Sequence, residues 1–219
     1  IYRINHVNIA LPKAPSSLPK GNNKWVASEY PKELKAIDKM AAWNKRDNAF
    51  KTKWIGYIET EFERRDKGYW FTNKGVPTYI TGSHYMYLQW SKIDVGLPDF
   101  REANRLFFLF WEACKADYRC FGICYLKIRR SGFSFMASSE CNNIGSSISD
   151  GHVGIMSKTG KDAASLFTEK VVNMFWNYPF FFKPMQSGMD RPKTELLFSL
   201  PSTKITRKNM NTSDDEKAL

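Results

Sequence analysis

The sequence predicts an α/β fold in which a mainly parallel sheet is flanked by helices and preceded by an extended or helical N-terminal arm. In the second half of the chain, strand-like apolar runs alternate with helix-like segments, which is the order that βαβ units with right-handed crossovers produce. The first thirty residues instead contain Pro12, Pro15, Pro19 and the polar stretch SSLPKGNNK, a composition typical of an arm.

Helical periodicity begins at Pro31, and apolar residues recur at three-to-four spacing up to Gly68, which we expect to end the second of two helices. The tripeptide NKG then predicts a turn between two aromatic strand-like runs. The alternating stretch HYMYLQW, residues 84–90, predicts a half-buried strand.

The second half of the chain supplies the βαβ pattern. We expect a helix over 98–117 with Asp99 as its cap, because its apolar residues fall on one face. The remaining expected elements are a buried strand at 119–128, a helix at 132–148, a buried strand at 151–159, a helix at 160–179 and a third strand or hairpin at 193–209.

The chain has 219 residues and carries 33 Lys and Arg against 22 Asp and Glu, a net charge of +11. This length suits one large domain, or one domain with an N-terminal extension. The positive balance favours a polyanionic partner such as nucleic acid, although general solubility charge explains it equally well. The four cysteines form no CxxC pair, so we expect free thiols rather than a zinc site.

The stretch CYLKIRRSGFSF has the order of a phosphate-binding loop: a strand-like run, basic residues, a glycine, a hydroxyl and the start of a helix. Compared with the pattern GxxxxGK[ST], Gly132 and Ser134 match the second glycine and the Mg²⁺-binding hydroxyl. Lys127 replaces the first glycine, and Phe133 replaces the usual lysine. The residues alone leave three alternatives: a nucleotide site with a displaced cation, a basic strand end, or an arginine pair that grips nucleic-acid phosphate.

Four stretches share their order and spacing with one family: SHYMYLQWSKI, FREANRLFFLFWEA, LKIRRSGFSF and GHVGIMSKTGKDAASLFTEKVVNMFWNYPFFFKP. They resemble the N-terminal ATPase domain of the large terminase subunit of tailed bacteriophages, the motor that packages DNA. LKIRRSGFSF is similar to the family's deviant Walker A loop, in which the cation sits at the front. The fold implied by the resemblance is an incomplete P-loop NTPase-type domain.

The resemblance implies a site for ATP and Mg²⁺ formed by Lys127, Arg129, Arg130, Gly132, Phe133 and Ser134. Lys127 and Arg129 would contact the phosphates, with Arg130 one residue later on the turn. Gly132 would allow close approach of the backbone, and the Ser134 hydroxyl would ligate Mg²⁺. On the adenine side, the resemblance points to Gln89 and Arg101, while Trp90 is better explained by core packing.

Lys158 and Lys161 follow the second expected strand, where a translocating motor would touch DNA phosphate. The alternative is that Ser157 or Thr159 only caps the following helix. The resemblance implies double-stranded DNA, the portal protein and the small terminase subunit as partners, and a homo-oligomeric ring in the complete motor. It implies the host cytoplasm, with transient attachment to the capsid portal, and no membrane.

An ATPase of this type also needs four apolar residues followed by Asp-Glu, and the acidic stretch TSDDEKAL does not match because polar residues precede its acids. We therefore expect an ATP hydrolase fragment that binds nucleotide but is inactive alone, with a nuclease domain further along the polypeptide. The expected organisation is an arm and helical extension at 1–69, a partial ATPase domain at 70–208 and a polar tail or truncated linker at 209–219. The alternatives are a non-enzymatic basic nucleic-acid-binding protein and a helicase-like P-loop ATPase outside packaging.

Overall fold

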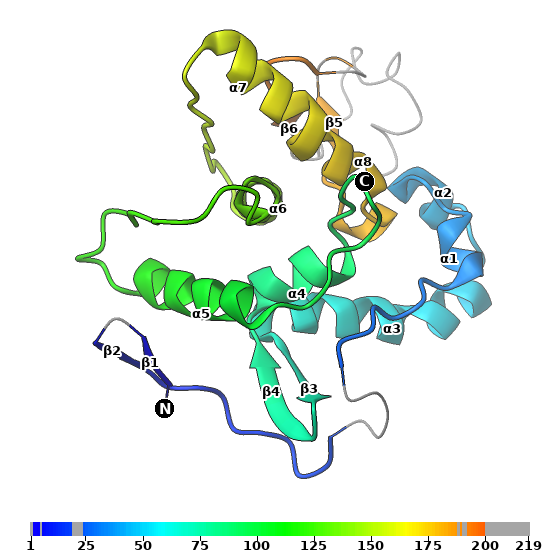
Figure 1. Cartoon of the computed structure of the whole chain (residues 1–219). Helices are drawn as coiled ribbons and strands as arrows, with labels where there is room; N and C mark the ends of the chain where they lie inside the picture. The colour runs from blue at the N-terminus through cyan, green and yellow to red at the C-terminus, as the bar shows by residue number, and fades with distance from the viewer. Residues whose placement is uncertain (1, 5, 19–23, 188, 190–191, 200–219) are drawn as a thin grey trace.

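The computed structural model of the chain describes residues 2–4, 6–18, 24–187, 189 and 192–199. Helices dominate it, and the strands within the described residues form antiparallel pairs (Figure 1). The first half contains β1 (Tyr2–Ile4), β2 (Val7–Ile9), α1 (Lys32–Lys35), α2 (Met40–Asn44), α3 (Asn48–Lys67), β3 (Tyr69–Asn73), β4 (Val76–Ile80) and α4 (Gly82–Gln89). The second half contains α5 (Glu102–Ala116), α6 (Phe133–Gly145), α7 (Gly160–Leu166), a π-helical turn (Phe167–Val172), α8 (Asn173–Asn177), a 3₁₀ turn (Phe180–Phe182), β5 (Gln186–Ser187) and β6 (Leu197–Phe198).

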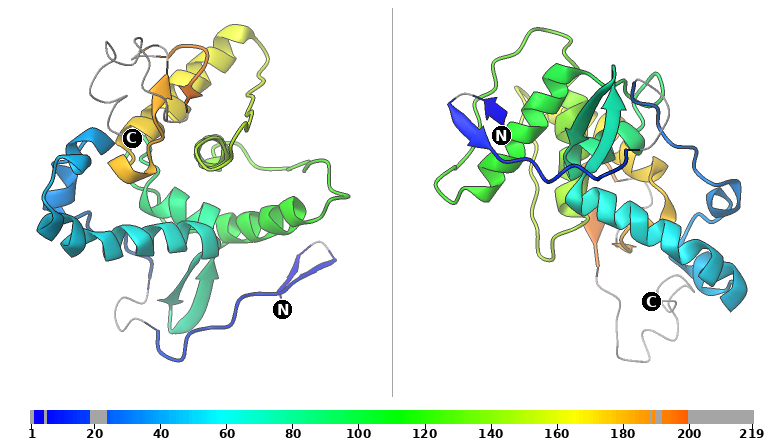
Figure 2. Two further views of the ribbon diagram at one scale, coloured as in Figure 1. Left: turned by 180° about the vertical axis from the view of Figure 1, so that it is seen from behind. Right: turned by 90° about the horizontal axis from the view of Figure 1, so that it is seen from below.

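The centre of the molecule is α4, all eight residues of which are buried. It contacts α3, α5 and α6, so that three longer helices surround it (Figures 1 and 2). The Thr81 side chain caps α4 by accepting a hydrogen bond from the His84 N–H at 3.2 Å. A helix buried all round has no polar face, and its apolar residues therefore carry no helical period.

A buried carboxylate joins α3 to α4. The Glu61 side chain is fully buried and accepts hydrogen bonds from the Tyr85 hydroxyl at 2.7 Å and from the Trp90 indole at 3.0 Å. Its other oxygen accepts from Arg64 at 2.7 Å. The charge is thus paired and hydrogen-bonded, as a buried carboxylate requires.

Burial also raises the pKa of Tyr85, and the neighbouring charge of Glu61 acts in the same direction. The phenol therefore stays protonated and remains the donor in its hydrogen bond to the carboxylate.

The predicted fold class is wrong for the described part of the chain. Its strands form the antiparallel hairpins β1–β2, β3–β4 and β5–β6, and no described strands pair in parallel. Residues 119–128 and 151–159, expected as buried strands, have no ladder partner in the described residues. Between them α6 packs on α4, on the π-helical turn and on α8, so helices surround the element that was expected to cover a sheet.

The two extended segments also leave apolar side chains exposed. Phe121 is 100% exposed, Leu126 98% and Met156 97%. Their apolar runs resemble those of buried strands, but an apolar run does not by itself specify the strand that pairs with it.

Local signals in the rest of the sequence were more reliable. The expected helix ending at Gly68 is α3, and Gly68 ends it with a positive φ of 77°. The NKG turn joins β3 to β4, and the expected helix after Pro31 is divided into α1 and α2. Residues 84–90 lie largely in α4 rather than in a strand, and α5 begins after Arg101 instead of at the expected cap Asp99.

The helix expected at 160–179 is present as α7, the π-helical turn and α8. Of the expected third strand at 193–209, residues 197–198 form β6, and residues 200–209 lie outside the described residues. The TSDDEKAL stretch lies outside them as well.

Candidate phosphate-binding site

The predicted loop lies between the extended segment 119–128 and the first turn of α6. We call residues 127–132 the basic loop. Its three cations, Lys127, Arg129 and Arg130, are exposed and make no hydrogen bond or ion pair with any described residue. Three uncompensated positive charges in four residues therefore face solvent at a helix N-terminus, where the helix dipole adds further positive potential.

Three aromatic rings fix the two ends of the basic loop. Tyr125 and Phe133 stack with ring centroids 4.9 Å apart and an interplanar angle of 26°. Phe107 of α5 contacts both rings, at centroid distances of 5.0 Å and 5.3 Å. We call these three residues the aromatic clamp. It closes the chain on itself around the cations and explains why Phe133 occupies the position of the usual lysine: in this structure it anchors the loop.

Two residues of the basic loop have positive φ angles. Arg130 has φ 63° and Gly132, the residue before α6, has φ 81°. A left-handed glycine costs little, whereas a left-handed arginine is uncommon and places the backbone in a tight turn. The predicted role of Gly132, close approach of the backbone to a phosphate, stays a prediction.

The first turn of α6 presents hydrogen-bond donors. The Gly132 carbonyl accepts from the N–H groups of Phe135 and Met136, whereas those of Phe133 and Ser134 have no described acceptor. The Ser131 hydroxyl is buried and also lacks a partner among the described residues. Unpaired donors at a helix N-terminus next to cations suit a phosphate group.

The described residues offer fewer groups that could bind Mg²⁺ than groups that could bind phosphate. Ser134 is half-buried in the first turn of α6, two residues after the end of the basic loop. No group of three or more His, Cys, Asp or Glu residues that could hold a metal ion occurs among the described residues. Mg²⁺ is commonly held by substrate phosphates and water with few protein ligands, and Ser134 would supply one of them.

The two expected adenine-side residues, Gln89 and Arg101, have different surroundings: Gln89 is buried and Arg101 is exposed. Gln89 is buried, and its side-chain amide pairs with the backbone of Ser28: it accepts from the N–H at 2.9 Å and donates to the carbonyl at 2.8 Å. That pairing uses the edge with which an amide would read adenine, so the structure gives Gln89 a role in holding the N-terminal arm. Trp90 packs in the core, as expected, and donates to Glu61.

Arg101 is exposed immediately before α5. Burial raises the pKa of the Tyr87 phenol, and the charge of Arg101 opposes that effect. The Tyr87 hydroxyl lies 4.0 Å from the position that a Cβ on Gly132 would take. A role for Arg101 on the adenine side stays a prediction.

Lys158 and Lys161 are exposed at the start of α7, and neither forms a hydrogen bond or ion pair with the described residues of the basic loop. Thr159 caps α7 by accepting a hydrogen bond from the Asp162 N–H at 3.1 Å. The capping alternative is thus confirmed for Thr159. Contact of the two lysines with DNA stays a prediction.

A charged network positions α6 from its other side. Glu140 of α6 accepts from the Trp111 indole at 2.8 Å and pairs with Lys115 of α5 at 2.9 Å. Lys115 also pairs with Glu112 at 2.9 Å. Burial lowers the pKa of Lys115, but the two carboxylates outweigh burial and raise it, so the amine stays charged and ties α5 to α6.

Local sequence patterns did not indicate the aromatic clamp or Glu140. Tyr125 and Phe133 lie on either side of the basic loop in the sequence, but Phe107 comes from another helix. Contacts between residues far apart in the chain cannot be read from local periodicity.

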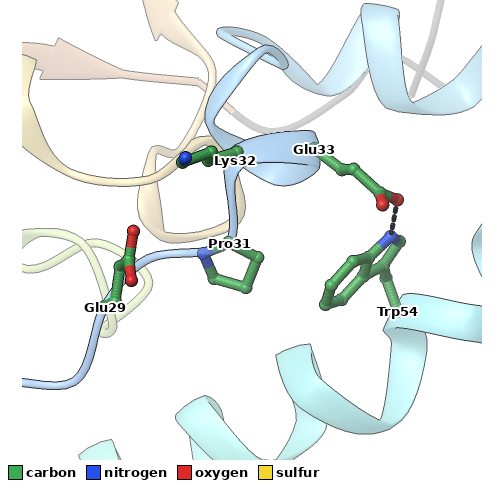
Figure 3. Close-up of a pocket in the computed structure, with 5 residues that line it drawn as sticks. All are labelled: Glu29, Pro31, Lys32, Glu33 and Trp54. Carbon is green, nitrogen blue, oxygen red and sulfur yellow. Dashed lines mark hydrogen bonds between the residues drawn. The ribbon is translucent and has the colours of Figure 1, made fainter.

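The described residues also contain an open depression of about 370 Å³ at the start of α1, lined by Glu29, Pro31, Lys32, Glu33 and Trp54 (Figure 3). The Trp54 indole donates to Glu33 at 3.0 Å, and Lys53 pairs with the same carboxylate at 2.8 Å. These hydrogen bonds hold the pKa of Glu33 below its usual value. Glu33 and Trp54 are thus hydrogen-bonded to each other, and no residue of the depression belongs to the basic loop.

Among the described residues, no helix is both long and apolar enough to cross a membrane. The cysteines are free, and Cys124 is exposed while the other three are partly buried. Comparison of the chain with protein-family models, with curated proteins and with solved structures finds no match in any of the three.

Proposed function

We propose that this chain is part of the ATPase region of a phage DNA-packaging motor and binds ATP with Mg²⁺ through the basic loop. The observation that carries the proposal is the closed loop itself: the exposed cations Lys127, Arg129 and Arg130 lie in the chain segment whose two ends the stacked rings of Tyr125 and Phe133 hold together, directly before α6. The order of extended segment, turn and helix is the one expected from the resemblance of LKIRRSGFSF to the deviant Walker A loop of large terminase subunits. The proposal does not depend on the parallel sheet, which the described residues do not form.

Each part of the loop has a task in this proposal. Lys127 and Arg129 neutralise the charge of the terminal phosphates, and Arg130 adds a third cation on the left-handed turn. The unpaired N–H groups of Phe133 and Ser134 donate to phosphate oxygens, while the Ser134 hydroxyl ligates Mg²⁺. ATP bound there would supply the terminal phosphoryl group, and its transfer to water, with ADP as the leaving group, would power DNA movement in the complete motor.

These residues serve binding, and we propose that the 219 residues do not turn ATP over at the rate of a working motor. Hydrolysis needs a carboxylate that activates water and another that positions Mg²⁺. In the full-length protein we propose a homo-oligomeric ring at the capsid portal, with the small terminase subunit and double-stranded DNA as partners.

A second candidate function is favoured by the exposure of the same three cations. A non-enzymatic protein could grip nucleic-acid phosphate with Lys127, Arg129 and Arg130 directly, and the net charge of +11 suits that partner. The two candidates differ in what the loop recognises, because a triphosphate engages the helix N-terminus whereas a nucleic-acid backbone needs only the cations.

Thermal unfolding separates the two candidates. We expect Mg-ATP to raise the melting temperature of the full chain, and Lys127→Ala or Arg129→Ala to abolish the increase. The matched control is Lys35→Ala, which removes an exposed cation from α1 and should leave the increase unchanged. If the loop variants lose affinity for a double-stranded oligonucleotide while ATP protects none of the proteins, the second candidate is correct.

A further inference from the structure

The hydroxyl of Tyr87 lies beneath the basic loop. It is the nearest atom to the position that a Cβ on Gly132 would take, at 4.0 Å, although Tyr87 belongs to the central helix α4. The glycine before α6 thus borders a polar group that comes from a helix distant in the sequence.

The ring of Tyr87 is held firmly. The residue is 3% exposed, and its ring lies 5.9 Å from that of Phe108 and 6.5 Å from that of His84, between centroids. With the ring packed on two sides, the hydroxyl has a fixed position, which is the condition for preorganised contact with a ligand.

The hydroxyl of Tyr87 has no hydrogen-bond partner among the described residues. Two other buried tyrosines have one: Tyr85 donates to Glu61 at 2.7 Å, and Tyr79 donates to the Lys67 carbonyl at 2.7 Å. Unlike the hydroxyls of Tyr57 and Ser131, which are buried without a described partner, the Tyr87 hydroxyl is not enclosed by protein atoms. Its unused donor is therefore accessible to water or to a ligand.

The surroundings define the chemistry of that partner. The unpaired Ser131 hydroxyl and the free N–H groups of Phe133 and Ser134 lie on the same loop and first helical turn. The charge of Arg101 acts on the Tyr87 phenol as well. These donors and the three cations all belong to residues 127–134, and no described acidic side chain pairs with the cations of the loop, so the partner is an anion rich in oxygen.

We infer that Tyr87 is a ligand-contacting residue of the basic loop, and that its hydroxyl donates a hydrogen bond to a phosphate oxygen of the bound nucleoside triphosphate. This inference rests on the proposed function, since it names a further contact in the same site. It assigns the contact to the phosphate chain and not to the nucleoside, because the hydroxyl lies beside Gly132 at the start of α6.

The test is Tyr87→Phe in the full chain, with Mg-ATP and inorganic tripolyphosphate as separate probes in equilibrium titrations. The substitution removes one oxygen that has no described partner, so the variant should fold with unchanged stability. We expect it to weaken both probes by about 10-fold, the cost of one hydrogen bond to a charged acceptor. Tyr118→Phe, at a tyrosine that is 90% exposed, is the control and should bind like the unsubstituted chain.

The outcomes separate the inference from the proposed function. If the chain binds both probes and Lys127→Ala weakens them while Tyr87→Phe does not, the inference is wrong and the proposed function stands. If Tyr87→Phe weakens ATP but not tripolyphosphate, the hydroxyl contacts the nucleoside and the assignment to phosphate is overturned. If the unsubstituted chain binds neither probe, the proposed function fails and the inference fails with it.

Discussion

The backbones of α3 and α4 approach each other closely at Gly82, the first residue of α4. A Cβ at this position would lie 1.8 Å from the Arg65 carbonyl oxygen, whereas a carbon–oxygen contact needs about 3.3 Å. Gly82→Ala must therefore move one helix by about 1.5 Å, because the opposing atom is backbone and cannot rotate away. Since α4 carries Tyr87 and Glu61 pairs with it from α3, this movement would disturb the core beneath the basic loop.

Overpacking of this kind costs about 3 kcal/mol. Gly56 provides the matched control, because it lies in α3, is exposed and has nothing within 4 Å of an added Cβ. In an exposed helix interior, Gly56→Ala should stabilise the chain by about 1 kcal/mol. The two substitutions are chemically identical, so the calculated difference of about 4 kcal/mol comes from position alone.

Urea unfolding of the full chain, followed by tryptophan fluorescence and by circular dichroism, measures both free energies of unfolding. We expect the two midpoints to shift in opposite directions from that of the unsubstituted chain. A Gly82→Ala variant that loses less than about 1 kcal/mol would refute the α3–α4 packing described here, since no rearrangement that preserves the contact accommodates the methyl group.

Three further predictions concern the core and the loop. Glu61→Ala leaves two buried donors and an arginine without their acceptor and should lower the free energy of unfolding in urea by about 3–5 kcal/mol. The control Glu63→Ala, at a 65% exposed side chain, should change it by no more than about 0.5 kcal/mol. Equal losses in the two variants would contradict the buried network. Burial lowers the pKa of His84 to about 3, so the unfolded chain takes up the proton first as pH falls below about 6.5. Between pH 7 and pH 5 the free energy of unfolding of the unsubstituted chain should therefore fall by about 2 kcal/mol relative to that of His84→Phe. Parallel pH profiles of the two proteins would contradict this. Phe133→Lys restores the residue of the usual pattern but breaks the stack on Tyr125. The increase in melting temperature that Mg-ATP produces should therefore be smaller in this variant than in the unsubstituted chain. A larger increase would show that nucleotide binding does not need the aromatic clamp.

Much of the helical part of the fold could be predicted because its signals are local. Gly68 ends α3, the NKG turn joins β3 to β4, and apolar periodicity marks α5. The central helix α4 was predicted as a strand because burial on every side leaves no helical period, and its cap Thr81 was the only local sign of a helix start.

The parallel sheet was predicted from segments that each resemble a strand. A sequence pattern does not contain the information that decides which strands pair with each other. An apolar run such as 119–128 has the composition of a buried strand, but the identity of its neighbour depends on contacts between distant residues. The same distinction applies to the site. Lys127, Arg129 and Gly132 are adjacent in the chain and could be found there, whereas Phe107 and Tyr87 reach the loop from α5 and α4.

The measurement that tests the central claim most directly is a calorimetric titration of Mg-ATP into the full chain and into Arg129→Ala at the same salt concentration. We predict saturable binding at one site per chain, weakened about 10-fold or more by the substitution, because a charge-assisted contact to phosphate is lost. Binding that does not saturate, or an affinity that Arg129→Ala leaves unchanged, would contradict the assignment of the basic loop as a nucleotide site.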